Sequence, residues 1–483
     1  MFEVIRVEEH VIISRMIHKI KKALVDDSAQ KAELDSARSR PTIKAHLIDR
    51  SEHDISREDI SEHALKVLYR LHKGGYQAYL VGGCVRDLML GLHPKDFDVV
   101  TDATPEQIKG LFRNCRLIGR RFRLAHVVFG REIIEVATFR GHHLPQQEFG
   151  QGKRVKSQQN QHGQLIRDNV FGSIEEDAER RDFTFNAMYY NIEDYAVTDF
   201  ANGREALKRR EIILIGDPET RYREDPVRML RAVRFAVKLD MTISGQTGSI
   251  IPELSHLLGN IPPARLFEEV SKLLLSGYGL KTFLLLKEYR LFGELFPQLV
   301  PFLDNPEGRE QQLLEKVLIN TDNRINSDMR ITPAFLYAAS LWCCVEDLMQ
   351  LHINEGGLQA NDAFNVAVTD VLHRQNQRIM IPKRFSTAIR DIWYLQQRLT
   401  KRIGRRAYMT LDHPRFRAAY DFLLIRAEVD GGELVELAQW WTEFQAAPPS
   451  QQKKMQNKLR NNEGGAERRK RRRKPASKRT SPE

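Results

Sequence analysis

The chain has 483 residues, which is too long for one hydrophobic core and predicts two to four packed units. Its 41% apolar and 29% charged residues are ordinary for a soluble globular protein, and no apolar run approaches the ~20 residues of a membrane span. The net charge of +11 lies almost entirely at one end, because residues 453–483 hold 13 of the 75 Lys and Arg but only 3 of the 64 Asp and Glu.

Residues 1–62 are expected to form a partly disordered N-terminal extension, with a short amphipathic helix in residues 1–25 in place of a secretory signal. The first packed helix is predicted at residues 63–71 and ends at Gly74 and Gly75. It opens an α/β head over residues 63–205. Within this head, strands are predicted at residues 77–81, 97–101, 116–119, 126–129 and 133–139, and helices at residues 85–90 and from Pro105 onward, capped by Thr104.

Residues 141–172 are polar and nearly without hydrophobic pattern, which predicts a mobile loop beside the site. Beyond Asp217 the hydrophobic periodicity is helical, so we expect a helical neck over residues 206–280 and a helical body over residues 281–450. The predicted helices cover residues 224–239, 265–275, 280–296, 333–349, 362–376, 385–399 and 415–427, and Trp440 and Trp441 mark the last packed helix. Residues 451–483 are expected to be a disordered Arg/Lys-rich tail, because like charges repel.

The first chemical motif follows the strand at residues 77–81. Gly82 and Gly83 let the backbone approach phosphate oxygens without a Cβ in the way, and the amides that follow favour anions. Arg86 and Asp87 lie in the first turns of the next helix. A plain turn is the alternative explanation of a glycine pair taken alone.

Asp96 and Asp98 flank Phe97 in the next predicted strand, where side chains at i and i+2 share one face. Two adjacent carboxylates repel each other and favour a cation between them. Hard oxygen ligands suit Mg²⁺, with Mn²⁺ as an alternative, and in a two-metal site one ion activates a hydroxyl while the other supports the leaving pyrophosphate. An acidic surface turn is the competing interpretation, which the neighbouring glycine pair makes the weaker one.

Two residues are candidates for a third carboxylate. Glu135 lies in the predicted strand at residues 133–139, where apolar neighbours make a charge costly unless it faces a ligand or a metal. Asp182 follows two arginines at an expected helix start, where an N-cap role alone would explain it.

Together these motifs resemble the class II nucleotidyltransferases of the polymerase-beta superfamily, the class that holds bacterial poly(A) polymerases and CCA-adding tRNA nucleotidyltransferases. The resemblance rests on Gly-Gly-x-Val-Arg-Asp, Asp-Phe-Asp, Arg-Arg-Asp-Phe and Glu-Asp-x-x-Arg, in this order, and is strong over residues 79–239. It implies an α+β fold, a polymerase-beta-like head followed by an all-helical body. It also implies that the head over residues 63–205 is catalytic, that the neck over residues 206–280 binds the nucleotide base and RNA, and that the body over residues 281–450 binds RNA.

The resemblance also implies roles for individual residues. Asp96 and Asp98 match the metal-binding pair, and Asp182 matches the catalytic Asp of the Arg-Arg-Asp motif, with Glu135 as the second choice. The nucleotide would be bound by Gly82, Gly83, Arg86 and Asp87, and its base by Asp225 and Arg228. An Asp that only accepts and an Arg that only donates suit the edge of a base, although Asp225 could also be a simple N-cap.

Three features favour the poly(A) polymerase branch over the CCA-adding branch. The segment with Arg120, Arg121 and Arg123 resembles that branch, as do the extension before Glu62 and residues 382–385. The basic tail resembles its C-terminal region, and we expect salt-sensitive RNA binding there. The tail arginines predicted to bind RNA are Arg469, Arg471, Arg472 and Arg473.

The predicted activity is therefore template-independent addition of adenylates from ATP to RNA 3′ ends, with release of pyrophosphate, in RNA processing and decay. A CCA-adding tRNA nucleotidyltransferase is the alternative, and an inactive RNA-binding protein of the same fold is the second. Expected partners are RNA 3′ ends and ATP, with RNA-decay or RNA-chaperone proteins as further candidates. The four cysteines form no CxxC pair, which favours reduced thiols and a cytoplasmic location. The sequence leaves open which RNAs are tailed, how CTP is excluded, and the oligomeric state.

Overall fold

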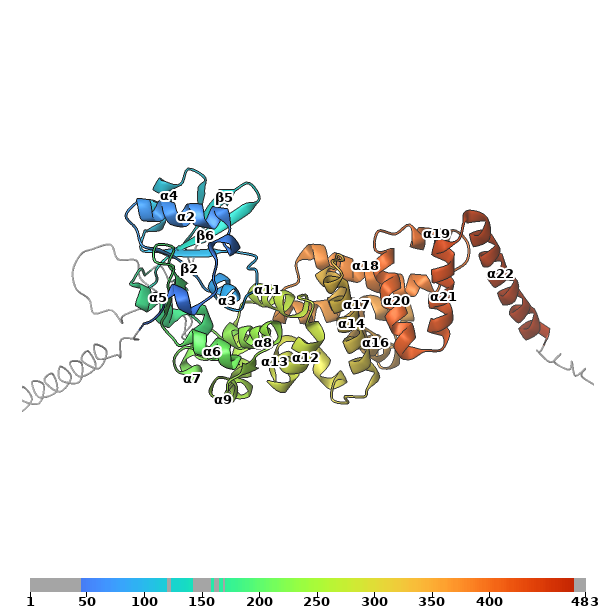
Figure 1. The fold of residues 1–483 in the computed structure, drawn as a ribbon. Helices are drawn as coiled ribbons and strands as arrows, with labels where there is room; N and C mark the ends of the chain where they lie inside the picture. The colour runs from blue at the N-terminus through green and yellow to red at the C-terminus, as the bar shows by residue number, and fades with distance from the viewer. Residues whose placement is uncertain (1–44, 120–122, 142–157, 160–164, 168–169, 473–483) are drawn as a thin grey trace, which may run out of the picture. The chain divides into compact units, whose positions relative to one another are not determined.

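The computed structural model describes residues 45–119, 123–141, 158–159, 165–167 and 170–472. The chain divides into two compact units (Figure 1). The head unit comprises the described residues of 1–152, 169–181 and 185–204, and the helical unit comprises those of 153–168, 182–184 and 205–483. Arg181 and Asp182 are neighbours in sequence, yet they belong to different units.

The head unit is built on an eight-stranded mixed sheet in the order β1-β10-β9-β2-β3-β6-β5-β4. At its centre β2 pairs antiparallel with β3, and β3 pairs parallel with β6. The predicted strands of the head are all present, whereas β1, β9 and β10 were not predicted, since each has only three residues. The strands are β1 (His46–Ile48), β2 (Ala78–Val81), β3 (Asp98–Thr101), β4 (Cys115–Ile118), β5 (Leu124–Phe129), β6 (Glu132–Thr138), β9 (Met188–Tyr190) and β10 (Val197–Asp199).

Helices α2 (Glu62–Lys73), α3 (Gly83–Met89), α4 (Pro105–Leu111) and α5 (Ile174–Arg180) complete the head (Figure 1). The predicted start of α4 is confirmed, because Thr104 accepts from the amide of Gln107 and Pro105 occupies the first turn. The predicted end of α2 is also confirmed, with Gly74 as its C-cap. Helix α2 buries Ala64, Val67, Leu68 and Leu71 on one face, which is the spacing expected of an amphipathic helix.

The polar loop predicted at residues 141–172 lies mostly outside the described residues. Two short strands within it, β7 (Gln158–Gln159) and β8 (Leu165–Arg167), pair with each other. No helix in the described part of the chain is long and apolar enough to cross a membrane. The cysteines Cys84, Cys115, Cys343 and Cys344 are all buried and form no disulfide.

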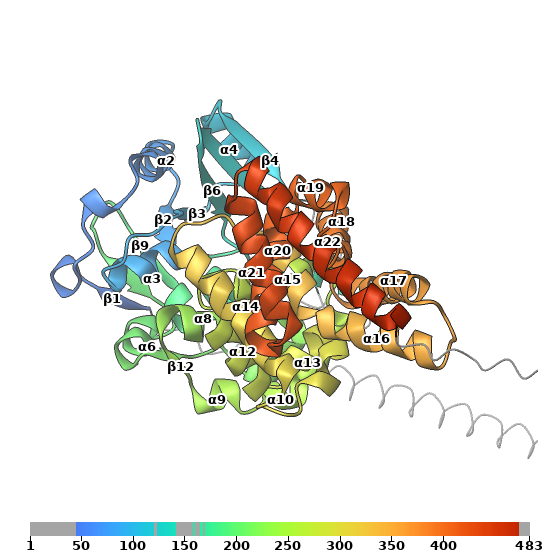
Figure 2. The same cartoon turned by 90° about the vertical axis from the view of Figure 1, so that its right-hand side faces the viewer.

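The helical unit confirms the predicted all-helical body (Figure 2). Among its described residues it also holds two short strand pairs, β7 with β8 and β11 (Glu211–Ile212) with β12 (Thr242–Ile243). Its first part contains α6 (Gly203–Arg209), α7 (Pro218–Glu224), α8 (Val227–Leu239), α9 (Gly245–Gly248), α10 (Ile251–Leu254), α11 (Pro263–Leu274), α12 (Gly279–Glu288), α13 (Leu291–Leu295) and α14 (Arg309–Asn326). Its second part contains α15 (Pro333–Ser340), α16 (Trp342–Asn354), α17 (Ala360–Arg378), α18 (Lys383–Leu399), α19 (Arg405–Leu411), α20 (Phe416–Asp430), α21 (Glu433–Ala446) and α22 (Pro449–Arg472).

Two predicted helices are each divided in the structure. The helix predicted at residues 280–296 becomes α12 and α13, because Arg290 adopts a left-handed conformation with φ 57°. The helix predicted at residues 333–349 is divided at Leu341, between α15 and α16. Hydrophobic periodicity continues across both breaks, which is why the sequence alone suggested single helices.

The expectation that the chain is disordered from residue 451 is wrong for its described part. Helix α22 runs from Pro449 to Arg472. Met455 and Leu459 pack against the apolar cluster around Trp441, and the side-chain amide of Gln452 donates to the carbonyl of Phe444 at 2.9 Å. This packing stabilises the first turns of α22, so the last packed helix is α22 and not the one that carries Trp440 and Trp441. Residues 473–483 lie outside the described part of the chain.

Candidate active site

A glycine turn follows the end of β2. Gly82 has φ 76° and ψ −127°, a backbone conformation that side chains rarely tolerate, and Gly83 begins α3. Arg86 is buried and donates from Nε and Nη2 to Oδ1 of Asp87, at 2.8 and 2.5 Å, and from Nη1 to Oδ1 of Asn186 at 3.2 Å. Arg86 therefore fastens α3 to the residues that precede β9.

The acidic pair lies at the start of β3. The strand begins at Asp98, one residue later than the predicted start at Phe97, and the predicted alternation of side chains across Phe97 holds. Phe97 is buried, while Asp96 and Asp98 on either side of it are exposed. The two carboxylates therefore project away from the core, on the side opposite Phe97.

Glu135 stands beside this pair. Asp98 of β3 is in register with Glu135 of β6, and β6 lies next to β3 in the sheet. His126 of β5 is in register with Glu135 from the other side, and its Nε2 lies 3.2 Å from Oε1 of Glu135. Three acidic side chains are thus brought to one part of the sheet by β3 and β6 and by the turn before β3.

The electrostatics of Asp98 reflect this crowding. Asp98 as a residue is exposed to solvent, but protein atoms surround its carboxyl group. This partial burial is the main cause that raises the pKa of Asp98 to about 6. The charges of Glu135 and Asp96 raise the pKa further, while the charge of Arg181 lowers it. A bound cation would relieve the repulsion, which is the physical condition for a metal site.

A buried network holds Arg181 near the glycine turn. Arg181 is the second Arg of the Arg-Arg-Asp-Phe motif, but no role was predicted for it. Arg181 donates to Oδ2 of Asp177 from Nε at 3.2 Å and from Nη2 at 2.9 Å, and its Nε also lies 2.8 Å from the hydroxyl of Tyr189. That hydroxyl donates to Asp177 at 2.7 Å. Tyr189 of β9 is in register with Val81, the residue before Gly82. A Cβ built on Gly82 would lie 3.4 Å from Nη1 of Arg181.

Asp182 belongs to the helical unit. Its Oδ2 accepts from Nε of Arg231 at 2.6 Å and forms an ion pair with that guanidinium, and its Oδ1 accepts from the amide of Phe183 at 2.8 Å. Arg231 lies on α8. Burial would lower the pKa of Arg231, but the charge of Asp182 and its hydrogen bond hold that pKa above its usual range. The helix that follows is a short 3-10 helix that begins at Thr184, so Asp182 does not directly precede it as the alternative N-cap interpretation requires.

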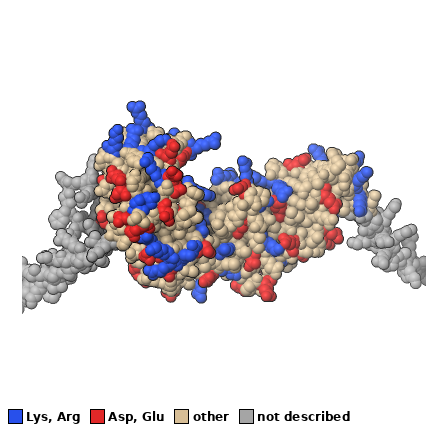
Figure 3. Space-filling view, viewed as in Figure 1, with Lys and Arg blue, Asp and Glu red and all other residues tan. Residues whose placement is uncertain are grey.

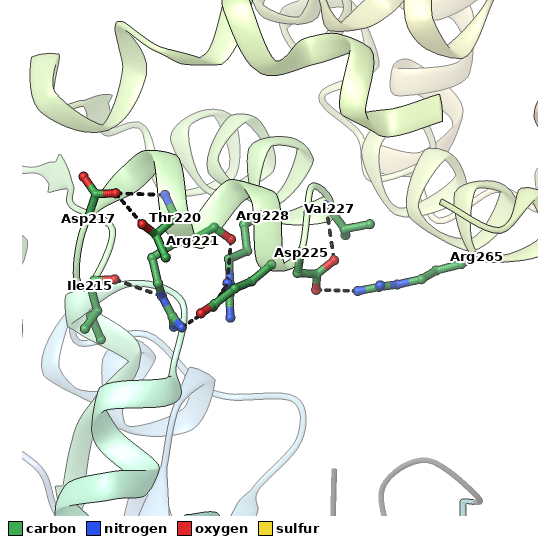
Figure 4. Close-up of polar contacts among 9 residues, drawn as sticks. Ile215, Asp217, Thr220, Arg221, Asp225, Val227, Arg228 and Arg265 are labelled. Carbon is green, nitrogen blue, oxygen red and sulfur yellow. Dashed lines mark hydrogen bonds and ion pairs between the residues drawn. The ribbon is translucent and has the colours of Figure 1, made fainter. Parts of the chain in front are cut away.

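Asp225 and Arg228, the predicted base-reading pair, each have a separate partner (Figure 4). Oδ2 of Asp225 accepts from Arg265 at 2.7 Å. Arg228 donates from Nη1 to the carbonyl of Arg221 at 2.6 Å and to Oε2 of Glu224 at 3.0 Å. Arg221 donates to the same Glu224 oxygen at 2.7 Å, and burial and the charge of Arg228 lower the pKa of Arg221 to about 10.

These contacts orient both predicted residues before any ligand binds. Asp225 ends α7 and precedes the first turn of α8. The alternative interpretation of Asp225 as an N-cap holds in part: Pro226 is the residue directly before α8, but Oδ1 of Asp225 accepts from the amide of Val227 at 3.4 Å (Figure 4). Glu224 is the Glu of the Glu-Asp-x-x-Arg motif, but no role was predicted for it. Arg221 and Arg265 lie outside that motif and were not predicted, and Arg265 reaches the pair from α11.

Of the arginines predicted to bind RNA, the structure describes the side chain of Arg123 alone. Arg123 is exposed and forms an ion pair with Glu106 of α4. Lys and Arg side chains project from the end of the head unit that carries α4 and β5 (Figure 3). Arg120, Arg121 and Arg473 lie outside the described residues, and the side chains of Arg469, Arg471 and Arg472 are also outside the description.

Three family models match the chain in order. Residues 78–213 match the poly A polymerase head domain, residues 240–303 match the probable RNA and SrmB-binding site of polymerase A, and residues 356–475 match the polymerase A arginine-rich C-terminus. The chain is 55% identical to poly(A) polymerase I of Escherichia coli over 438 residues, which are 90% of this chain and 92% of that protein. The chain belongs to the bacterial poly(A) polymerase family. It is thus a nucleotidyltransferase.

Other relatives of this poly(A) polymerase family member are less similar. Poly(A) polymerase I of Haemophilus influenzae is 48% identical over 86% of the chain and 90% of that protein. The CCA-adding enzyme of Bacillus pumilus is 35% identical over only 48% of the chain and 54% of that protein. The crystal structure of the Bacillus stearothermophilus CCA-adding enzyme in complex with CTP superposes with a TM-score of 0.50 and 25% identity, covering 78% of this chain and 80% of that one.

The donor set of the site fits a divalent ion that also binds a nucleotide. Within the described residues, no group of three or more His, Cys, Asp or Glu is arranged as a closed metal cage. Mg²⁺ is usually held by one or two carboxylates together with substrate phosphates and water, so an incomplete protein cage suits it. Asp96 and Asp98 supply two such carboxylates, and the raised pKa of Asp98 indicates a group that a cation would stabilise in its charged form.

Proposed function

We propose that the chain extends RNA 3′ ends with adenylates from ATP, without a template, and releases pyrophosphate. The observation that carries this proposal is the acidic pair beside the glycine turn, in a chain 55% identical to poly(A) polymerase I over 90% of its length. The activity belongs to RNA processing and decay, and the protein would act in the cytoplasm.

Within this proposal, the backbone of Gly82 and Gly83 receives the phosphates, because no Cβ obstructs their approach. Asp96 and Asp98 would hold Mg²⁺ or Mn²⁺. A divalent ion held there supplies charge that makes the RNA 3′-hydroxyl a better nucleophile and stabilises the leaving pyrophosphate. The residues themselves position the reactants for in-line attack on the α-phosphorus, and no covalent intermediate is needed.

Glu135 is proposed as the third carboxylate, ahead of Asp182. It is supported by its register with Asp98 and by its contribution to the raised pKa of Asp98. Asp182 instead neutralises Arg231 in the helical unit. A catalytic role for Asp182, which the motif resemblance favours, stays a prediction, and the two assignments can be separated by substitution.

Asp225 and Arg228 are proposed to select adenine. Arg265 holds the side chain of Asp225, and Glu224 holds that of Arg228. Because both side chains are already ordered, less conformational entropy is lost when a base binds. A hydrogen-bond acceptor and a set of donors held in fixed positions can distinguish adenine from cytosine, because the two bases present different donor and acceptor patterns.

The test is nucleotide incorporation by the purified chain. An oligo(A) primer and a tRNA without its CCA end are each offered ATP, CTP, GTP or UTP alone, with Mg²⁺ or with Mn²⁺. Long ATP-dependent tails on the primer are expected. Incorporation of CTP on the tRNA alone would identify a CCA-adding enzyme instead, and RNA binding without any incorporation would identify an inactive relative.

A further inference from the structure

The turn between α18 and α19 carries an unusual run of positive charge. Residues 398–406 contain Arg398, Lys401, Arg402, Arg405 and Arg406, and no acidic residue occurs between Asp391 and Asp412. Like charges this close repel one another, so the run is unfavourable unless an anion neutralises it. The run lies within the helical unit and far in sequence from the basic tail.

The backbone of this turn is firmly held. The indole of Trp441 donates to the carbonyl of Leu399 at 2.8 Å, and Gln456 of α22 exchanges two hydrogen bonds with the backbone of Gly404, at 3.0 and 3.4 Å. Leu399 and Ala407 are buried in the apolar cluster around Trp441. With these residues directed inward, Arg398, Lys401 and Arg406 remain exposed on the outer side.

Two adjoining hollows lie on this outer side, next to α18 and α19. Their volumes are about 290 and 350 Å³, and both are lined by Arg398 and Lys401. Arg406 completes the second hollow. The first also contains His413, and its only acidic member is Asp391. Both are open and shallow, which suits an extended polymer better than an enclosed small molecule.

The cations of the hollows differ from other arginines of the helical unit. Arg309, Arg324 and Arg426 form ion pairs with Asp430, Asp421 and Glu346 respectively. In the described part of the chain, no ion pair involves Arg398, Lys401 or Arg406. These charges are therefore available to an external anion.

Neutral groups in the hollows add interactions of a second kind. Nδ1 of His413 accepts from the amide of Arg415 at 3.1 Å, so the proton of the neutral ring lies on Nε2, which is a donor. The ring of Tyr394 lines the first hollow, and its hydroxyl donates to Asn365 at 2.9 Å. Met409, which is 52% exposed, lines the second hollow. Aromatic and apolar side chains beside cations are typical of surfaces that bind single-stranded nucleic acid.

We propose that the two hollows, which we call the α18–α19 hollows, bind successive backbone phosphates of the RNA that the chain extends. The proposal rests on the proposed function for the class of its ligand. The shared pair Arg398 and Lys401 lies between the hollows, so neighbouring phosphates of one strand can be neutralised in a row. This site is separate from the tail, and it holds RNA by charge without reading its sequence.

The test compares three full-length variants. In the first, Arg398→Gln, Lys401→Gln and Arg406→Gln remove the charge of the hollows. In the matched control, Arg209→Gln, Arg330→Gln and Arg374→Gln remove the same charge from exposed positions elsewhere in the helical unit, outside residues 240–303. In the third, Arg398→Lys, Lys401→Arg and Arg406→Lys keep the charge. This variant shows whether a folding defect at these positions explains weaker RNA binding by the first variant.

Binding of a labelled single-stranded RNA is measured without ATP over a range of salt concentrations. The first variant should bind roughly tenfold more weakly at about 0.15 M salt, and its salt dependence should be lower by about 2 in the log–log slope, at about 0.7 for each phosphate no longer neutralised. The control and the charge-keeping variant should bind nearly as the unaltered chain does. Equally weakened binding in the first variant and the control would overturn the proposal.

Primer extension separates this proposal from the proposed function. At saturating RNA the first variant should keep its kcat with ATP, while its KM for RNA rises. The binding measurement does not depend on catalysis, so it remains decisive even if the unaltered chain incorporated no adenylate. If the unaltered chain polyadenylates RNA but the first variant binds RNA as tightly as the unaltered chain, the proposed role of the hollows is rejected and the proposed function stands.

Discussion

At the scale of single residues, the acidic pair and the glycine turn could be predicted from the sequence, because local spacing alone places them. Alternation across Phe97 directs Asp96 and Asp98 to one side, and the glycine turn needs only a strand followed by two glycines. The third carboxylate could not be decided in this way. The register between Asp98 and Glu135 depends on the pairing of β3 with β6, whose partner residues are 37 positions apart.

Asp98 provides a prediction about stability and pH. Its pKa, about 6 in the folded chain, exceeds the value of about 4 expected when unfolded. The folded state therefore holds this proton more tightly, and its contribution to stability, full below about pH 4, is lost as the pH rises through about 6. In chelator above pH 6, Asp98→Asn should raise the Tm, with no such increase near pH 4.

Asp412→Asn, an exposed carboxyl in the helical unit, is the control for this measurement and should leave the Tm unchanged at both pH values. Thermal melts followed by circular dichroism suffice. A lower Tm for Asp98→Asn above pH 6 would contradict the crowding of carboxylates that the structure describes.

Tyr189 tests the buried network that the sequence did not reveal. Burial alone would raise the pKa of Asp177, but Arg181 and the Tyr189 hydroxyl hold that pKa below its usual range. Tyr189→Phe removes a hydrogen bond to a buried charge, so the free energy of unfolding should fall by about 1–3 kcal/mol. The kcat for primer extension should also fall, because Arg181 is the cation that lowers the pKa of Asp98.

The matched control is Tyr195→Phe, since Tyr195 is 39% exposed in the same unit. Urea unfolding and primer extension are measured on both variants. Equal, small effects from the two substitutions would show that the network has no special importance for the site.

At the scale of elements, periodicity predicted which segments are helical but not where they end. Arg290 divides α12 from α13 without a Pro or Gly to announce the break. For α22 the error was of another kind: the density of charge after residue 453 predicted disorder where the structure has a helix. Its packing comes from Gln452, Met455, Gln456 and Leu459, a polar and apolar face that meets the cluster around Trp441 and is recognisable only once that cluster is known.

Helix α22 therefore predicts two different results for two truncations. Deletion of residues 462–483 should leave the Tm unchanged, since it spares Met455, Leu459 and the two glutamines that fasten α22. It should weaken RNA binding and flatten its salt dependence, by about 0.7 in the log–log slope for each phosphate that the tail no longer neutralises. Deletion of residues 451–483 should in addition lower the Tm, because it uncovers the apolar cluster around Trp441.

Replacement of residues 468–474 by Ser, at full length, controls for chain length in the RNA measurement. It should reproduce the weaker salt dependence of the shorter deletion. An unaltered salt dependence in both would count against RNA binding by the tail, and an unaltered Tm after the longer deletion would contradict the packing of α22.

At the scale of the whole molecule, the resemblance of four ordered motifs was enough to predict the family, which the relatives confirm. The distribution of charge predicted a basic end, yet the α18–α19 hollows were not predicted. The positive charges of residues 398–406 are visible in the sequence, but only the ion pairs formed by other arginines show that Arg398, Lys401 and Arg406 remain available. The division into two compact units was expected from length, but the interruption of the head at residues 182–184 was not.

The central claim is that adenylate transfer depends on the carboxylates of Asp98 and Glu135 acting with Asp96. The most direct measurement is single-adenylate addition to an oligo(A) primer at saturating ATP and Mg²⁺, by the unaltered chain and by Asp98→Asn, Glu135→Gln and Asp182→Asn. We predict a fall in kcat on the order of a hundredfold or more for Asp98→Asn and Glu135→Gln, and a smaller one for Asp182→Asn. Undiminished addition by Asp98→Asn would contradict the claim, and a larger fall in Asp182→Asn than in Glu135→Gln would return the third role to Asp182.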